Sequence, residues 1–411
     1  MKAPRAASAA GAKAPGITAA VLNVSHPAMM LERFAGLTIL ERQLFTLSRA
    51  GMRRVWIVAH KPEPASLARL RWPDGLDGLW GTVSGSSGAA AAYAPPYIGV
   101  SGDYAIRLGA LREILSRRHD RPTSYQDAQR RGVVQVVPVR HEDRIEYEKR
   151  AMPPDSCALL QTPADKGPAL PWLLREAVKD ADGFMARHFD RRISLAVTRR
   201  LLNSPVRPNH MTVFSSLIGL AGGILMLGGT YGFTLAGALI VWLHSTLDGC
   251  DGELARLRFQ ESRLGGLIDF WGDNLVHFAL FASLGIGRFS VTGEPVLLAL
   301  GLAAALSAAA SAALVFQHML RKAARAREGT PFFDGIADAA DETDAQDPAS
   351  AGSRLKRTLA SIEDTLAQRD FIYLLVLLAA IGRIDLFLWA AGVGSPLFLL
   401  VFVYLRSRAR A

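Results

Sequence analysis

The sequence predicts an α/β domain followed by an all-α polytopic membrane domain of six transmembrane helices. Three observations support this fold class. The chain has 411 residues, more than one ordinary domain contains. Its first half alternates short apolar runs with helical patterns. Its second half contains apolar stretches of the length that a helix needs to cross a hydrocarbon layer of ~30 Å.

The α/β domain is expected over residues 17–165. Its strands are predicted at the runs ITAAVLNV, RRVWIVAH, YIGVSG and VVQVVPV, with a helix over 37–51 and a loop in the Gly-, Ser- and Ala-rich stretch 81–92. Residues 1–16 are small, basic and interrupted by proline, and they lack the apolar core of a secretory signal. We expect them to form a flexible cytosolic tail.

An amphipathic helix is expected within 179–205. Apolar side chains recur there at helical spacing among many arginines, namely Phe184, Phe189, Ile193, Val197 and Leu201. Such a helix suits the surface of an anionic membrane. The alternative is a basic helix that packs on the soluble domain.

The membrane domain is expected over 206–411. Its spans are predicted at 211–232, 234–247, 264–287, 295–318 and, within a long apolar tract, on either side of a break near 382–385. A competing turn lies in AGVGSP, which begins at Ala391. The acidic segment within 328–353 is poor in apolar residues and is expected to be disordered.

Charge sets the predicted orientation. The chain has 47 Lys and Arg against 37 Asp and Glu, a net charge of +10, which suits anionic lipids, nucleotides or nucleic acid. Basic residues cluster after the fourth span and in the C-terminal tail. By the positive-inside rule, both segments and both termini face the cytosol across the plasma (inner) membrane. Cys157 and Cys250 are too few for a disulfide framework.

Four aspartates stand out at the boundary between the second and third spans. Asp248 and Asp251 are three residues apart and Asp269 and Asp273 are four apart, so each pair lies on one face of its helix. Four uncompensated carboxylates in a membrane would cost on the order of 10 kcal/mol. Oxygen ligands of this kind favour Mg²⁺ or Mn²⁺, which commonly share their coordination shell with a substrate phosphate. The pattern indicates phosphoryl or phosphoalcohol transfer; a cation transporter is the alternative from another class.

The neighbouring residues fit an anionic substrate. Gly252 and Ala255 leave space beside the carboxylates, and Arg256 supplies a fixed fork of donors for phosphate oxygens. Gly265 and Gly266 allow the two helices to approach closely. The eight positions Asp248, Asp251, Gly252, Ala255, Arg256, Gly265, Asp269 and Asp273 match the signature DxxDGxxAR(x8)GxxxDxxxD. In this respect the chain resembles the CDP-alcohol phosphatidyltransferases.

The resemblance extends from about residue 179 to the C-terminus, and it implies a Mg²⁺-dependent reaction. An acceptor hydroxyl would attack the β-phosphorus of a CDP-alcohol, and CMP would leave. The implied metal ligands are Asp248, Asp251, Asp269 and Asp273, and Asp273 would also act as the general base. Gly252, Ala255 and Arg256 would contact the nucleotide and pyrophosphate, with Asn209 and Thr212 near the cytidine. His244 and His277 are expected to orient the aspartates or to pack, with metal ligation as the alternative.

The first half is similar to the sugar-phosphate nucleotidyltransferases, which have a Rossmann-like fold. The matching positions are Gly36, Leu40, Glu41, Arg42, Gly51 and Val55. The segment 23–29, NVSHPAM, has neither the glycine nest nor the lysine of a phosphate cradle, so the domain is expected to be degenerate. Asp103 could correspond to that family's metal-binding aspartate, or the Gly102-Asp103 pair could be a turn. The architecture is similar to that of bifunctional proteins with inositol-phosphate cytidylyltransferase and di-inositol-phosphate phosphate synthase activities.

The predicted function is therefore transfer of a phosphatidyl or polyol-phosphate group from a CDP-alcohol to a hydroxyl acceptor, in phospholipid synthesis. CDP-diacylglycerol from the bilayer and a soluble CDP-polyol such as CDP-inositol remain alternative donors. The acceptor could itself be a phosphorylated polyol. The resemblance also implies a homodimer, and no nucleic-acid partner is expected.

Overall fold

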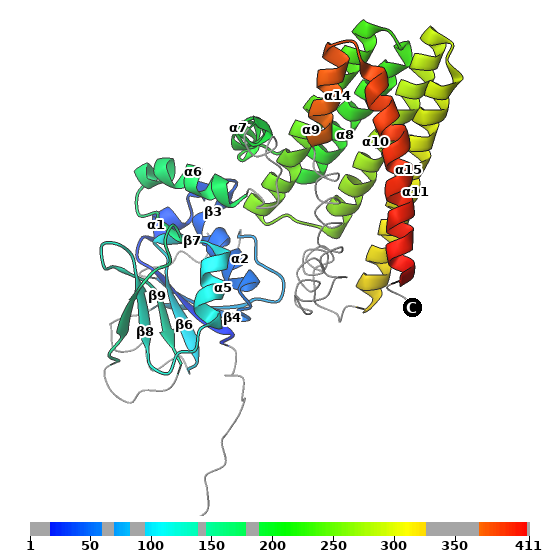
Figure 1. Ribbon diagram of the computed structural model, residues 1–411. Helices are drawn as coiled ribbons and strands as arrows, with labels where there is room; N and C mark the ends of the chain where they lie inside the picture. Colours follow the sequence, from blue (N-terminus) through cyan, green and yellow to red (C-terminus); the bar gives the residue numbers. More distant parts are fainter. Residues whose placement is uncertain are drawn as a thin grey trace, which may run out of the picture. The chain divides into compact units, whose positions relative to one another are not determined.

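The computed structural model describes residues 17–59, 70–82, 95–138, 145–177, 189–325 and 370–408. The chain divides into two compact units, Met1–Glu176 and Ala177–Ala411, which are coloured along the sequence in Figure 1. The predicted tail over 1–16 and the predicted disordered segment over 328–353 lie outside the described residues.

The first unit is built on a mixed seven-stranded sheet with the order β10-β8-β9-β6-β1-β4-β5. The strands are β1 (Ala19–Val24), β4 (Arg54–Ala59), β5 (Asp77–Thr82), β6 (Tyr97–Ser101), β8 (Thr123–Gln126), β9 (Gly132–Val137) and β10 (Glu148–Ala151). β1 runs parallel to both of its neighbours, β4 and β6, whereas β9 is antiparallel to β6 and β8. In β1 only Asn23 is exposed, as expected for a central parallel strand that is covered on both faces. The predicted α/β domain is confirmed.

Short elements complete this unit. The helices are α1 (Pro27–Met30), α2 (Ile39–Arg49), α5 (Leu108–Ser116) and α6 (Lys166–Glu176). Two small antiparallel sheets pair β2 (Arg33–Phe34) with β3 (Leu37–Thr38), and β7 (Tyr104–Ile106) with β11 (Cys157–Leu159). Thr38 and Glu41 form a capping box that fixes the start of α2. The buried Arg42 donates to the carbonyl oxygens of Phe34 and Ala35 and thereby holds the turn that precedes the helix.

The second unit is helical. Its helices are α7 (Arg191–Leu201), α8 (Pro208–Leu225), α9 (Tyr231–Arg258), α10 (Arg263–Thr292), α11 (Pro295–Arg325), α14 (Asp370–Ala380) and α15 (Ile384–Arg408). Five of them are long and apolar enough to cross a membrane, namely α8 with the turn that follows it, α9, α10, α11 and α15. The remaining predicted span falls on α14, an apolar helix of 11 residues.

The long apolar tract breaks where the sequence predicts. Gly382 adopts a positive φ of 71° between α14 and α15. The competing turn from Ala391 lies inside α15, so the split near 382–385 is confirmed. The predicted second span is longer than expected, because α9 continues as one helix of 28 residues through Asp248, Asp251 and Arg256.

Close helix contacts hold this unit together. A Cβ atom at Gly222 of α8 would lie 3.0 Å from the carbonyl oxygen of Gly237 on α9. A Cβ atom at Gly285 of α10 would lie 2.8 Å from the Cα atom of Gly301 on α11. Small residues at such crossings let the backbones approach, which is how membrane helices gain van der Waals contact. The packing fixes α8, α9 and α10 around the acidic motif.

Candidate active site

Three carboxylates meet between α9 and α10. Asp248 and Asp251 come from α9 and Asp269 comes from α10, and one oxygen atom of each lies within 4.8 Å of the others. Asp248 and Asp251 are buried, and Asp269 is partly exposed. The i,i+3 spacing on α9 gives its two aspartates the same direction. The antiparallel course of α10 then supplies the third.

This donor set fits a small divalent ion. All three ligands are carboxylate oxygens, the donors that Mg²⁺ and Mn²⁺ prefer. Oxygen ligands of an octahedral Mg²⁺ are about 3 Å apart when adjacent and about 4.2 Å apart when opposite, so three oxygens that lie within 4.8 Å of one another can reach one ion after small side-chain movements. Asp248, Asp251 and Asp269 would therefore hold the ion, and positions left open by the protein would remain for substrate phosphate.

Asp273 lies one turn beyond Asp269 on α10 and faces a histidine. The Nε2 atom of His244 is 3.5 Å from Oδ1 of Asp273, and the Nδ1 atom of His244 is 2.9 Å from the carbonyl oxygen of Ser215. The Asp273 side chain is 38% exposed, so a substrate hydroxyl could reach it. His277, by contrast, packs against the ring of Phe371 with centroids 5.5 Å apart.

The first turns of α8 meet this hairpin. Pro208 occupies the first turn of the helix, where its missing N–H costs nothing. The Thr212 hydroxyl donates a hydrogen bond to Oδ2 of Asp251. A Cβ atom at Gly265 would lie 2.8 Å from Oδ1 of Asn209, so this glycine provides the space for Asn209. The structure thus brings Thr212 to Asp251 and Asn209 to Gly265 of the signature.

The α9–α10 turn is shaped by its caps. Phe259 ends α9 with a positive φ of 52°, and its N–H bonds back to the last turn of the helix. Ser262 begins α10, and its hydroxyl accepts a hydrogen bond from the N–H of Gly265 at 3.0 Å. These two caps set the direction in which α10 returns along α9.

Arg256 lies over Gly252 on α9. Its Nε donates to the carbonyl oxygen of Ala177 at 2.8 Å, and its Nη1 would be 3.0 Å from a Cβ atom at position 252. A larger residue than glycine would push the guanidinium away. The site next to Asp251 therefore has two small residues, Gly252 and Ala255, and a positive charge on Arg256 that a hydrogen bond keeps in place.

Glu253 is a buried acid that sequence reasoning missed. Its side chain is fully buried and accepts hydrogen bonds from Arg191 Nη1 at 2.8 Å, Ser194 Oγ at 2.7 Å and Thr198 Oγ1 at 2.6 Å. The three donors follow one face of α7. The available signal in the sequence was the helical spacing of Arg191, Ser194 and Thr198. The many arginines nearby made these three residues hard to distinguish from an exposed basic face.

The polar face of α7 is turned inward and part of its apolar face is turned outward. Arg191, Ser194 and Thr198 are buried, whereas Ile193 of the helix is 38% exposed and Phe189, two residues before the helix, is 55% exposed. The neighbouring Asp190 accepts hydrogen bonds from Thr246 of α9 and Tyr373 of α14, at 3.1 and 2.6 Å. Of the predicted amphipathic segment, residues 179–188 lie outside the described residues.

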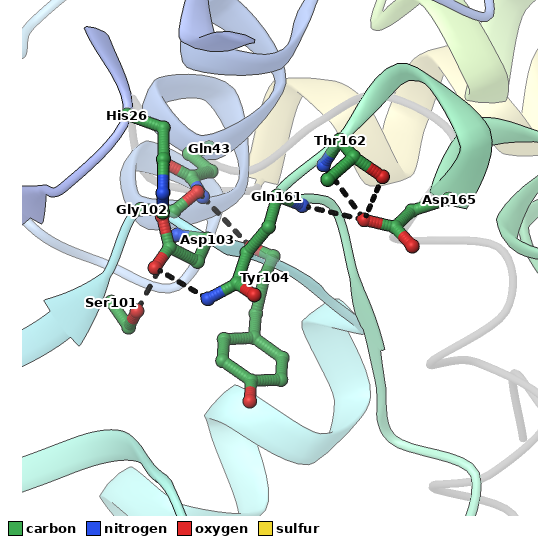
Figure 2. A network of polar contacts seen from close by, with 9 residues as sticks. All are labelled: His26, Gln43, Ser101, Gly102, Asp103, Tyr104, Gln161, Thr162 and Asp165. Atoms are coloured by element: carbon green, nitrogen blue, oxygen red, sulfur yellow. Dashed lines mark hydrogen bonds and ion pairs between the residues drawn. The ribbon is translucent and has the colours of Figure 1, made fainter.

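A separate polar network surrounds Asp103 in the first unit (Figure 2). Its Oδ1 is 3.0 Å from Nδ1 of His26, and its Oδ2 accepts a hydrogen bond from Gln161 Nε2 at 3.1 Å. Gln43 donates to the carbonyl oxygens of Gly102 and Tyr104, both at 2.7 Å, and so fixes the backbone on both sides of the acid. Protein donors therefore contact both oxygens of this carboxylate.

Part of the second unit is similar to a known protein family. The CDP-alcohol phosphatidyltransferase family matches residues 205–333. A bifunctional IPC transferase and DIPP synthase of Thermococcus kodakarensis is 39% identical over 138 residues, which are 33% of this chain and 30% of that protein. Its counterpart in Archaeoglobus fulgidus is 37% identical over 115 residues, 28% of this chain and 22% of that protein.

Other relatives cover similar stretches. A phosphatidylinositol phosphate synthase of Mycobacterium tuberculosis is 30% identical over 101 residues, 25% of this chain and 46% of that protein. A crystal structure of the synthase from the same species with CDP-DAG bound shares 20% identity over 52% of this chain and 92% of that one, with a TM-score of 0.33. The chain spans less than a third of the length of the two bifunctional relatives. The family match over residues 205–333 and the two bifunctional relatives show that the C-terminal half of the chain carries a CDP-alcohol phosphatidyltransferase domain.

Proposed function

We propose that the protein is a membrane-embedded, Mg²⁺-dependent transferase that moves a phosphoalcohol group from a CDP-alcohol to a hydroxyl acceptor and releases CMP. The observation that supports this most directly is the convergence of Asp248, Asp251 and Asp269 within a signature whose eight positions are all intact. A transporter would need acids distributed along a path, whereas these cluster at one helical hairpin.

The chemistry follows from the positions of the side chains. A bound Mg²⁺ would neutralise the pyrophosphate charge and stabilise the leaving oxygen. Arg256 binds phosphate oxygens beside Gly252, and Thr212 holds Asp251 in place through its hydroxyl. Asp273 accepts the proton of the acceptor hydroxyl. The acceptor oxygen then forms its bond to the β-phosphorus as the bond from that phosphorus to the CMP oxygen breaks.

The setting is a membrane. We place the site at the cytosolic face of the plasma (inner) membrane, with α14 as the sixth crossing and both termini in the cytosol, because the basic segments lie on that side. The exposed Phe189 and Ile193 suit contact of α7 with the membrane interface. We expect the chain to act as a homodimer in phospholipid synthesis.

A second donor class has its own support. The two bifunctional relatives share 39% and 37% identity with this chain, against 30% for the phosphatidylinositol phosphate synthase. A soluble CDP-polyol such as CDP-inositol is therefore the alternative to CDP-diacylglycerol. The first unit would then act as a degenerate nucleotidyltransferase-like domain, in keeping with the protein donors that surround Asp103.

The test is CMP release by purified protein with Mg²⁺. CDP-diacylglycerol and CDP-inositol are each offered with glycerol phosphate, inositol phosphate, inositol and serine. We expect one donor to give CMP, and EDTA to abolish the release. Asp273→Asn should abolish turnover while it leaves expression and donor binding intact. Wild-type rates in that variant would remove the proposed base, and no CMP from any pair would reject the function.

A further inference from the structure

We propose that Arg258 is a positioning residue that sets the start of α8 against the acidic hairpin and thereby controls donor binding. This inference rests on the proposed function. Arg258 is the last residue of α9, lies within the unspecified part of the signature, and is only 6% exposed. Its guanidinium contacts the end of α7 and the connection between α7 and α8.

Arg258 donates hydrogen bonds to backbone carbonyl oxygens at the end of α7 and in the connection that follows it. Nε donates to Leu202 at 3.0 Å, and Nη1 donates to Val206 at 2.6 Å. Nη2 donates to Leu202 at 2.7 Å, to Ser204 at 2.9 Å and also to Leu201. One side chain therefore gathers carbonyl groups from four residues, so the path of the chain around it is fixed.

The physical reason is a shortage of local donors. The six residues 202–207 lie between the helices, so their carbonyls have few regular backbone partners, and a buried carbonyl without a donor is costly. Arginine supplies five N–H groups in a rigid planar fork. The single ammonium nitrogen of a lysine could not bond at the same time to the carbonyl groups that the three guanidinium nitrogens of Arg258 contact.

The connection leads directly into the predicted nucleotide contacts. Asn209 and Thr212 follow it on the first turns of α8, and Thr212 bonds to Asp251 on the helix that carries Arg258. α9 thus holds the start of α8 at two points, through Arg258 and through Asp251. If Arg258 is lost, the connection relaxes, and Asn209 and Thr212 shift relative to the aspartates.

The experiment compares Arg258→Lys and Arg258→Gln with the wild type, using the donor that gives CMP. We expect the KM for the donor to rise by at least 10-fold, with a smaller change in kcat and an unchanged KM for the acceptor. Arg383→Lys, in the exposed turn between α14 and α15, is the matched control and should behave as the wild type. An unchanged donor KM in Arg258→Lys would overturn the proposal.

Two further measurements separate positioning from a general loss of structure. Thr212→Val should raise the donor KM as well. In the double variant Thr212→Val/Arg258→Lys, the fold-increase in donor KM should be smaller than the product of the two single fold-increases, because both residues act through the start of α8. Independent effects would contradict the inference. Hydrogen exchange in 203–212 should be faster in Arg258→Lys and unchanged in α11. This readout needs no turnover, so it tests the positioning even if the wild type releases no CMP, and unchanged exchange would refute it.

Discussion

His244 and Asp273 face each other across the interface of α9 and α10, with Nε2 of the histidine 3.5 Å from Oδ1 of the aspartate. The other ring nitrogen lies 2.9 Å from the carbonyl oxygen of Ser215 on α8. A carbonyl can only accept, so Nδ1 carries a proton and the ring is oriented by the backbone of a third helix. The ring that lies beside the proposed base is therefore held by the backbone of a third helix, and it belongs to a residue outside the eight-position signature.

Replacement of His244 by alanine should lower kcat by about 10- to 100-fold, the usual effect of losing a residue that orients a reactive carboxylate. Donor KM should change little, because the nucleotide contacts lie elsewhere. The assay is CMP release at saturating donor. His119→Ala in the first unit is the matched control. Equal kcat values for wild type and His244→Ala would show that Asp273 needs no such support.

The space at Gly265 gives a second prediction. A methyl group there would lie 2.8 Å from Oδ1 of Asn209 and 3.0 Å from Oγ of Ser262. Gly265→Ala should therefore push α8 away from α10 and reduce turnover by more than 10-fold. Gly232→Ala is the matched control, since a Cβ atom at that helical glycine meets nothing within 4 Å. If both variants have wild-type rates, the contact with Asn209 has no catalytic importance.

The buried Glu253 predicts a stability effect. Glu253→Leu would remove the carboxylate that pairs with the buried Arg191. Breaking a buried ion pair in this way should lower the free energy of unfolding by about 3–5 kcal/mol. The double variant Arg191→Leu/Glu253→Leu removes both charges and should be less destabilised than Glu253→Leu. The unfolding temperatures of the single and the double variant in detergent show which of the two is less stable. A double variant that unfolds at the lower temperature would contradict the assigned charge pair.

Local rules predicted much of the site. Spacings of three and four residues place each aspartate pair on one helix face, and the turn between the helices brings three of the four acids together. Gly382 and the charged residues Arg383 and Asp385 marked the break in the apolar tract. These features depend on a few consecutive residues, so sequence was sufficient to find them.

The contacts that sequence could not supply are long-range. Glu253 and Arg258 both meet partners more than 50 residues away, on α7 and in the connection after it. In the first unit, His26 reaches Asp103 across 77 residues. Nothing near these residues indicates which neighbour they meet, because tertiary packing determines it. The sequence alone therefore does not distinguish these residues from other polar residues.

The network around Asp103 in Figure 2 yields a prediction about pH. Oδ2 of Asp165 accepts hydrogen bonds from the N–H groups of Thr162 at 2.7 Å and Gln161 at 3.0 Å, and so holds the segment that presents Gln161 to Asp103. The backbone hydrogen bond from Thr162 is the main cause that lowers the pKa of Asp165 below its ordinary value. The folded state therefore binds this proton less readily than the unfolded chain. The resulting stability is present above the unfolded pKa and is lost as the pH falls through the lower, folded value.

Asp165→Asn should consequently weaken this segment at neutral pH by about 1 kcal/mol, the typical effect of losing a capping carboxylate. The measurement is the hydrogen-exchange protection of the 161–165 amides in the full chain. The difference between variant and wild type should be constant from pH 7 to about pH 5 and should shrink below about pH 4, as Asp165 of the wild type becomes protonated. A difference that persists undiminished at pH 2 would mean that the carboxylate charge does not hold Gln161 in place.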